Sequence, residues 1–176
     1  MVVKRLSRIL GGSETPEGVD GQVFKDIQAA IVKDRYAYFK DFLDNFYNVD
    51  KLGPDRISEQ AWQGSFNVAA GSSPHASYAC VATWLTDFRA DLPNIDVPML
   101  VVHGTEDRIL PYEATAKRLP GLVADLKLIA VEGGPHNIGW THPEESNKAL
   151  LEFLAEDTGR SAGLDRDLSA AARSKS

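Results

Sequence analysis

One aspartate and one histidine each follow an apolar stretch at the point where a strand is expected to end. Asp107 follows the run Val97–Val102. His136 follows the run Leu126–Val131, 29 residues beyond the aspartate. Both runs are rich in β-branched residues, which favour strands. Because ligands and catalytic groups gather beyond the carboxyl ends of strands in open α/β sheets, these two side chains are the first candidates for a shared site.

A carboxylate beside an imidazole has a defined chemical use. The carboxylate accepts the proton of one ring nitrogen, which fixes the tautomer and leaves the other nitrogen to act as a base. The order strand, helix, strand, helix predicts parallel strands with a right-handed crossover, so both loops emerge on one side of the sheet. The spacing therefore favours contact between Asp107 and His136. The alternative is a surface aspartate and a loop histidine with no joint role.

A metal site is the weaker interpretation of this region. Four residues of suitable types occur there, namely His103, Asp107, His136 and His142. No HExxH motif, paired CxxC motif or comparable ligand spacing accompanies them. His103 is the last residue of the expected strand, a position typical of a structural histidine. We therefore expect no metal site here.

The elements that position the pair begin with a helical cap or lid over residues 17–92. Apolar residues recur there at spacings of three and four, which indicates helices. Asp34, Ser58 and Ser73 are each expected to cap a helix. Residues 48–54 are expected to form a loop. The helix after Ser73 should bury Tyr78, Val81, Trp84, Leu85 and Phe88.

A strand–helix–strand–helix core is expected over residues 93–157, which places the chain in the α/β class. Its strands are the two apolar runs, and Glu113–Leu119 is predicted to be helical. Pro143 opens the last helix. Residues 1–16 form an irregular lead-in, and the polar composition of residues 158–176 predicts a disordered tail. The inner face of the last helix should carry Ala149, Leu150, Phe153 and Leu154.

The composition is that of a soluble globular protein, with 43% hydrophobic and 25% charged residues in a chain of 176. The formal net charge of −6 disfavours a nucleic-acid partner. No apolar run reaches the roughly 20 residues of a membrane span, so no membrane partner is expected. The single cysteine, Cys80, excludes an intrachain disulfide and is expected in the core. Without a recognisable signal peptide, the prediction is a reducing, cytoplasmic setting.

Three segments resemble the C-terminal part of the cofactor-free haloperoxidases, α/β-hydrolase-fold enzymes also described as perhydrolases and arylesterases. Thr83–Pro111 ends in HGTEDRILP, Glu132–Glu145 begins EGGPHN, and Val23–Tyr47 is similar to the helical cap. The resemblance implies that Asp107, in the HGxxDxxxP loop, and His136, in the GxPH turn, belong to a Ser-Asp-His triad. The fold it implies is the C-terminal part of an α/β hydrolase, with the cap, the last two parallel strands and an incomplete central sheet.

The sequence departs from that family at the nucleophile. The family serine lies in a GxSxG turn between a strand and a helix, ahead of the aspartate and the histidine. The nearest strings are Gly64-Ser65-Phe66 and Gly71-Ser72-Ser73-Pro74, and neither follows an expected strand. The oxyanion-hole turn of the family is not found either. We therefore expect a fragment, a truncated product or one half of a split enzyme, inactive in isolation.

Two functions stay open. In the first, a serine from an N-terminal half attacks a small ester or carboxylic acid, with this chain supplying the acid and the histidine. Water then releases an acid, or peroxide releases a peracid that oxidises halide without haem, flavin or metal. Candidates for the acyl pocket are Trp84, Phe88, Ile138 and Trp140. In the second, the chain is an inactive remnant or an interaction module whose open strand edge pairs with a partner or with a second copy.

Overall fold

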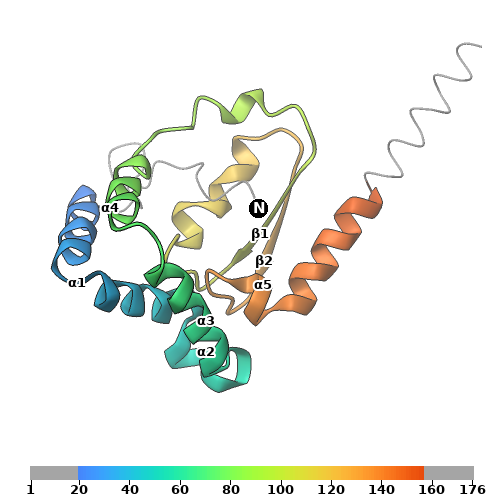
Figure 1. Cartoon of the computed structure of the whole chain (residues 1–176). Helices are drawn as coiled ribbons and strands as arrows, with labels where there is room; N and C mark the ends of the chain where they lie inside the picture. The colour runs from blue at the N-terminus through green and yellow to red at the C-terminus, as the bar shows by residue number, and fades with distance from the viewer. Residues whose placement is uncertain (1–19, 157–176) are drawn as a thin grey trace, which may run out of the picture.

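The computed structural model describes residues 20–156, so the predicted lead-in and tail lie outside the described residues. Helices come first, in the order α1 (Gly21–Tyr47), α2 (Val49–Arg56), α3 (Glu59–Ala70) and α4 (Pro74–Thr83). The strands β1 (Met99–Gly104) and β2 (Leu126–Val131) follow, then the short helix α5 (Ile138–Thr141). Residues 143–156 are also helical. Figure 1 shows α1–α4 on one side of the strands and the 143–156 helix on the other.

The two strands pair in parallel, as the sequence predicts. Their register runs from Met99 opposite Leu126 to Gly104 opposite Val131. Both strands therefore end at the same edge of the sheet, and the loops that carry the candidate residues start from neighbouring positions.

The helix predicted between the strands is present as two short pieces of the 3₁₀ type. Two 3₁₀ segments, η3 (Tyr112–Ala114) and η4 (Ala116–Gly121), occupy this connection. Thr115 separates them, with non-helical backbone angles of φ −126° and ψ −92°. Its hydroxyl donates to the carbonyl of Pro111, a local side-chain bond that competes with regular helix formation.

The helix caps follow the prediction. Asp34 breaks the helical angles inside α1, at φ −158° and ψ 97°, and its carboxylate accepts from the backbone N–H groups of Tyr36 and Ala37. Ser58 and Ser73 cap α3 and α4 in the same manner. Short polar side chains thus begin these helices where the sequence places them.

The loop predicted over residues 48–54 is wrong, because most of this stretch belongs to α2. The helix contains Pro54, which would ordinarily end it. Gly53 accommodates the proline with a kink at φ 29° and ψ −142°, a conformation that glycine adopts readily. Asn48 starts the helix in the left-handed region, with φ 50°.

The prediction for α4 holds at its start and fails at its end. The helix ends at Thr83, so Trp84, Leu85 and Phe88 lie beyond it. Only Val81 of its predicted buried face is fully covered, whereas Tyr78 is 41% exposed. Cys80 is exposed as well, contrary to the expected core position. Apolar residues surround α4 instead of marking one face, so the sequence does not indicate which side packs.

The described part of the chain contains three apolar clusters. The first lies around β1 and η4 and includes Leu92, Val101, Ala116, Leu119 and Val123. The second joins α1 to α4 through Phe24, Ile31 and Val81. The third joins α1 to α3 and contains Leu43, Tyr47 and Ile57. The cap helices therefore pack mainly on one another, and they reach the strands through a few specific contacts.

The predicted inner face of the 143–156 helix is only partly covered. Ala149 is buried, whereas Leu150 and Leu154 are 48% and 49% exposed.

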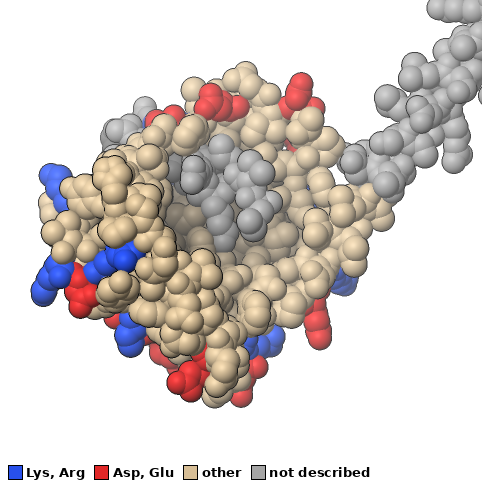
Figure 2. Space-filling model, in the orientation of Figure 1, with Lys and Arg blue, Asp and Glu red and all other residues tan. Residues whose placement is uncertain are grey.

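On the face seen in Figure 2, charged side chains lie mainly at the periphery. Among the described residues, no helix has the length and apolar content needed to cross a membrane.

Candidate active site

Asp107 and His136 are in direct contact. Nδ1 of His136 lies 2.9 Å from Oδ1 and 2.8 Å from Oδ2 of Asp107. Asp107 belongs to the turn that follows β1, and His136 belongs to the turn that follows β2. The contact expected from the parallel strand order is therefore present.

Backbone bonds join these two turns closely. The N–H of Thr105 donates to the carbonyl of Val131, and the N–H of Glu106 donates to the carbonyl of Gly134. This approach leaves no room for a side chain on Gly104, where a Cβ would stand 2.1 Å from the Gly134 carbonyl oxygen. The glycine after the strand histidine is thus required for the two loops to meet.

The carboxylate of Asp107 is buried and heavily hydrogen-bonded. Oδ1 accepts from the backbone N–H groups of Ile109 and Leu110, at 2.9 and 2.8 Å. Nε2 of His103 lies 3.2 Å from Oδ2. Burial alone would raise the pKa of this carboxyl, but hydrogen bonds from His103 and His136, the charge of His136 and the Leu110 N–H together hold the pKa well below its usual range. Asp107 is therefore ionised at neutral pH.

The cap helices hold the histidine turn from the other side. The ring of Phe46, in α1, packs against the imidazole of His136, with centroids 4.8 Å apart. The backbone N–H of Asn137 donates to the Phe46 carbonyl, and the side-chain amide of Asn137 donates to the Tyr47 hydroxyl. That hydroxyl also bonds to the hydroxyl of Ser65, in α3, at 2.7 Å.

A second set of contacts joins α2 to the acid turn. The side-chain amide of Asn48, which is fully buried, donates to the carbonyl of Glu106 at 2.9 Å. Lys51 pairs with the Glu106 carboxylate. Arg108 pairs with Asp50 at 2.7 Å. Both halves of the Asp107–His136 pair are therefore anchored to the helical region.

This arrangement defines a chemical role for the imidazole. The ionised carboxylate only accepts, so Nδ1 of His136 carries a proton. In the neutral ring the lone pair is then on Nε2, which can take a proton from a nucleophile. The buried negative charge of Asp107 stabilises the imidazolium that forms.

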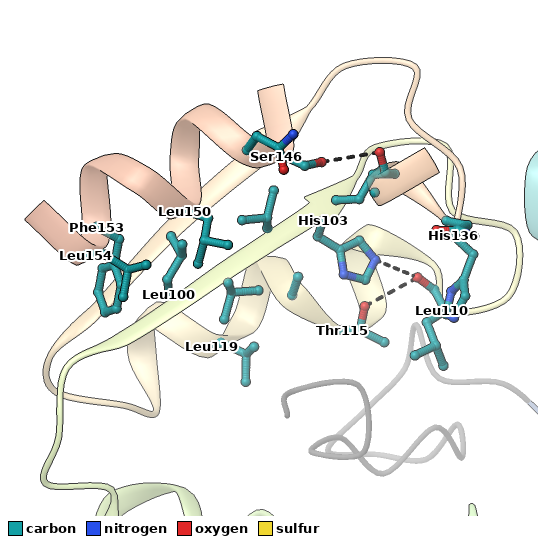
Figure 3. A pocket seen from close by; sticks show the side chains of 17 residues that line it. Leu100, His103, Leu110, Thr115, Leu119, His136, Ser146, Leu150, Phe153 and Leu154 are labelled. Atoms are coloured by element: carbon teal, nitrogen blue, oxygen red, sulfur yellow. Dashed lines mark hydrogen bonds between the residues drawn. The ribbon is translucent and has the colours of Figure 1, made fainter. Parts of the chain in front are cut away.

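The four candidates for an acyl pocket do not gather in one place. A groove of about 510 Å³ runs between β1, the His136 turn and the 143–156 helix (Figure 3). Ile138 lines this groove, but Trp84, Phe88 and Trp140 do not. Trp84 packs on the α1–α4 cluster, and Trp140 is 55% exposed. The groove is mainly apolar and includes Leu100, Leu119, Leu150 and Phe153.

The four residues considered as metal ligands have other partners. His103 contacts Asp107 and the carbonyl of Leu110. His142 bonds through Nδ1 to the Thr141 hydroxyl, and its pKa is lowered by burial and by the charge of Arg56. Within residues 20–156, no group of three or more His, Cys, Asp or Glu side chains is arranged to hold a metal.

The serine strings of the cap region sit in helical surroundings. Ser65 lies inside α3. Ser73 caps α4, and Ser72 precedes it in the turn after α3. None of the three follows a strand.

Several residues that shape the site were not predicted as part of it. Phe46, Tyr47 and Asn48 lie at the end of α1 and the start of α2, and the contact of His103 with Asp107 was also missed. A signal for His103 exists, since it lies four positions before Asp107 across a tight turn. Nothing local in the sequence marks the other three.

Comparison with known families matches residues 15–143 to the alpha/beta hydrolase fold. The "Putative non-heme chloroperoxidase" of Synechocystis sp. is 53% identical over 146 residues, which are 83% of this chain and 53% of that protein. The "Bifunctional esterase/perhydrolase DCH" of Acinetobacter calcoaceticus is 33% identical over 79% of this chain and 51% of its own length. The chain thus spans about half the length of the curated relatives it matches.

Solved structures agree with this assignment. The bromoperoxidase from Bacillus anthracis superposes with a TM-score of 0.80 at 30% identity, over 86% of this chain and 55% of that one. The esterase EaEST from Exiguobacterium antarcticum superposes with a TM-score of 0.75 at 20% identity, over 86% of this chain and 54% of that one, and shows the shared fold.

Proposed function

The chain belongs to the alpha/beta hydrolase family, and we propose that Asp107 and His136 are the acid and the base of a Ser-Asp-His triad for acyl transfer. The observation that carries this proposal is the contact of 2.8 Å between the buried carboxylate and Nδ1 of the imidazole. The position of both residues just beyond the ends of parallel strands supports it.

In the proposed reaction, Nε2 of His136 takes the proton of a serine hydroxyl as the serine oxygen attacks the carbonyl carbon of a small ester or carboxylic acid. The imidazolium then gives that proton to the departing alcohol or water, leaving an acyl-enzyme. Water releases the acid from this intermediate, or hydrogen peroxide releases a peracid. A peracid so formed can oxidise halide in solution. Asp107 stays ionised throughout and holds the ring.

The nucleophile of this scheme lies outside residues 20–156. We propose that the serine and the oxyanion-hole donors come from the half of the hydrolase fold that the relatives contain beyond the matched region. The substrate class rests on relatives described as chloroperoxidases and as an esterase/perhydrolase. Of the four acyl-pocket candidates, the proposal keeps Ile138, which lines the groove together with His136. It drops Trp84, Phe88 and Trp140, which do not line that groove. A reducing, cytoplasmic setting fits the single cysteine.

Complementation tests the proposal. The chain is co-expressed with the N-terminal half of the B. anthracis bromoperoxidase, and the purified mixture is assayed with p-nitrophenyl acetate. We expect hydrolysis, together with fluorophosphonate labelling of a serine in the added half. His136→Ala should abolish both hydrolysis and labelling. The matched control is His75→Ala, which removes an exposed histidine of α4 and should leave the rate unchanged.

A soluble complex without hydrolysis would contradict the proposal. It would instead support an inactive remnant or an interaction module, an alternative favoured by the apolar groove beside β1. Light scattering on the chain alone would reveal the self-association expected from an open strand edge.

A further inference from the structure

Asp107 lies between two imidazoles, and the scheme above uses only one of them. Nδ1 of His136 is 2.8 Å from Oδ2, and Nε2 of His103 is 3.2 Å from the same oxygen. The His103 side chain comes from β1 and is 5% exposed. The carboxylate is thus held from the strand as well as from the histidine turn.

A second contact fixes the protonation of the His103 ring. Nε2 of His103 also lies 2.9 Å from the carbonyl oxygen of Leu110. A carbonyl oxygen can only accept, so the proton of this ring is on Nε2. The same N–H donates to the Leu110 carbonyl, a bond drawn as a dashed line in Figure 3. Nε2 also lies 3.2 Å from Oδ2 of the ionised Asp107 carboxylate.

His136 contacts both oxygens of the carboxylate, and the other groups around Asp107 each contact one of them. Oδ1 receives the N–H groups of Ile109 and Leu110, and Oδ2 receives His103. Leu110 takes part twice, because its N–H binds the carboxylate while its carbonyl binds His103. The terminal torsion of an aspartate is intrinsically broad, so its orientation depends on such external contacts.

We infer that His103 is a positioning residue, which orients the Asp107 carboxylate toward Nδ1 of His136 and stabilises its ionised form. The contact stands on its own geometry, and its consequence for catalysis rests on the proposed function. The competing explanation is that His103 only anchors the turn through the Leu110 carbonyl. That structural role would leave the ionisation of Asp107 unchanged.

The charged surroundings of Asp107 permit a clean test. The titratable groups that bond to it are His103, from β1, and His136, from the turn after β2. Its chain neighbours Glu106 and Arg108 pair with Lys51 and Asp50 of α2. Replacement of His103 therefore removes one donor without disturbing these outer ion pairs.

The experiment follows the Asp107 carboxyl carbon by ¹³C NMR across a pH titration of the full chain. Asp107→Asn identifies its resonance. In His103→Phe, which keeps a ring and loses the N–H, we expect the carboxyl to titrate at least one pH unit higher, a tenfold or greater gain in proton affinity. His103→Gln, which retains an N–H donor, should restore much of the wild-type behaviour. Unchanged titration in folded His103→Phe would overturn the inference.

A measurement on the unmodified chain covers the case of a variant that fails to fold. Imidazole ¹⁵N spectra should show His103 as the Nε2–H tautomer at neutral pH. A ring with its proton on Nδ1 alone would overturn the inference. Neither NMR test depends on hydrolysis. A shifted carboxyl titration in His103→Phe without activity in the complemented wild type would support His103 and refute the triad.

The complemented enzyme adds a readout of the catalytic consequence. We expect His103→Phe to lower kcat about tenfold and to move the acidic limb of the pH profile upward, with KM little changed. His103→Gln should recover most of kcat. A loss in both variants with no movement of the acidic limb would assign His103 a structural role only.

Discussion

The aromatic ring of Phe46 lies against the imidazole of His136, with their centroids 4.8 Å apart and their planes tilted by 51°. This contact connects the end of the first cap helix to the base of the proposed triad. An aromatic neighbour excludes water from one face of the ring and restricts its rotation. Helix α1 therefore helps to position the site.

Replacement of Phe46 should show how much its ring contributes to stability and how much to catalysis. Phe46→Ala removes a half-buried ring, so we expect a loss of about 2 kcal/mol in the free energy of unfolding, below the ~3–5 kcal/mol of a fully buried phenylalanine. The hydrolysis rate of the complemented enzyme should fall about tenfold, because His136 gains freedom. Urea denaturation and p-nitrophenyl acetate turnover measure the two quantities. Phe46→Leu is the control that keeps apolar cover, and equal losses in both variants would contradict a specific role for the ring.

The hydroxyl of Tyr47 joins α1, α3 and the histidine turn. It bonds to Ser65 at 2.7 Å and accepts from the Asn137 amide at 3.2 Å, while the residue is only 3% exposed. Tyr47→Phe leaves both partners without this bond, so we expect a loss of about 1–3 kcal/mol in unfolding free energy. Chemical denaturation gives the value.

A double-mutant cycle with Ser65→Ala should show coupling, because the two hydroxyls share one bond. Tyr78→Phe removes a hydroxyl from a side chain that is 41% exposed and serves as the matched control. Additive effects of Tyr47→Phe and Ser65→Ala would show that the network does not act as a unit.

Asn48 and Lys51 contact the same residue, Glu106, but should differ in their contribution to stability. Asn48 is fully buried, has a positive φ of 50° and donates to the Glu106 carbonyl. Asn48→Ala loses that bond and places alanine in the left-handed region, which should cost about 2–4 kcal/mol. Lys51→Ala breaks an exposed ion pair and should cost less than about 1 kcal/mol.

Denaturation at low and high salt distinguishes the two contributions. The loss of unfolding free energy in Lys51→Ala should shrink as the salt concentration rises, because exposed charges are screened. The loss in Asn48→Ala should persist. Asn48→Gly relieves the backbone strain without restoring the bond, so its loss should lie between those of the other two variants.

The pairing of Asp107 with His136 was predictable because strand ends leave a local signal. A β-branched run followed by a polar loop marks each end, and the parallel order of the strands brings the loops together. Apart from His103, the groups that hold the pair leave no such signal. Asn137 meets Tyr47 across 90 residues, and Asn48 meets Glu106 across 58. Periodicity shows which face of a helix is apolar, but it does not show what that face contacts.

The errors in the fold have a related origin. Gly53 and Pro54 are ordinary loop signals, and here the glycine adopts the kink that lets α2 continue through the proline. Thr115 satisfies a backbone carbonyl with its own hydroxyl, so the segment between the strands becomes two short 3₁₀ turns. In both places the local bonding or the backbone freedom of one residue determines the structure, and the sequence pattern around that residue does not.

The buried carboxylate of Asp107 should make stability depend on pH in the acid range. Its pKa in the folded chain is well below the value near 4 expected when the chain unfolds. Between these two values the unfolded state binds one more proton than the folded state. The contribution of Asp107 is therefore complete above about pH 4 and is lost as the pH falls, by up to about 1.4 kcal/mol for each pH unit.

Asp107→Asn removes this titration, so its unfolding free energy should be lower at neutral pH and should fall less steeply below about pH 4. Urea denaturation at a series of pH values between about 3 and 7 gives both slopes. Asp96→Asn, at an exposed aspartate ahead of β1, is the control and should retain the wild-type slope. If the unfolding free energies of wild type and Asp107→Asn changed in parallel with pH, the carboxylate would gain no net stabilisation from its two histidines and two backbone donors.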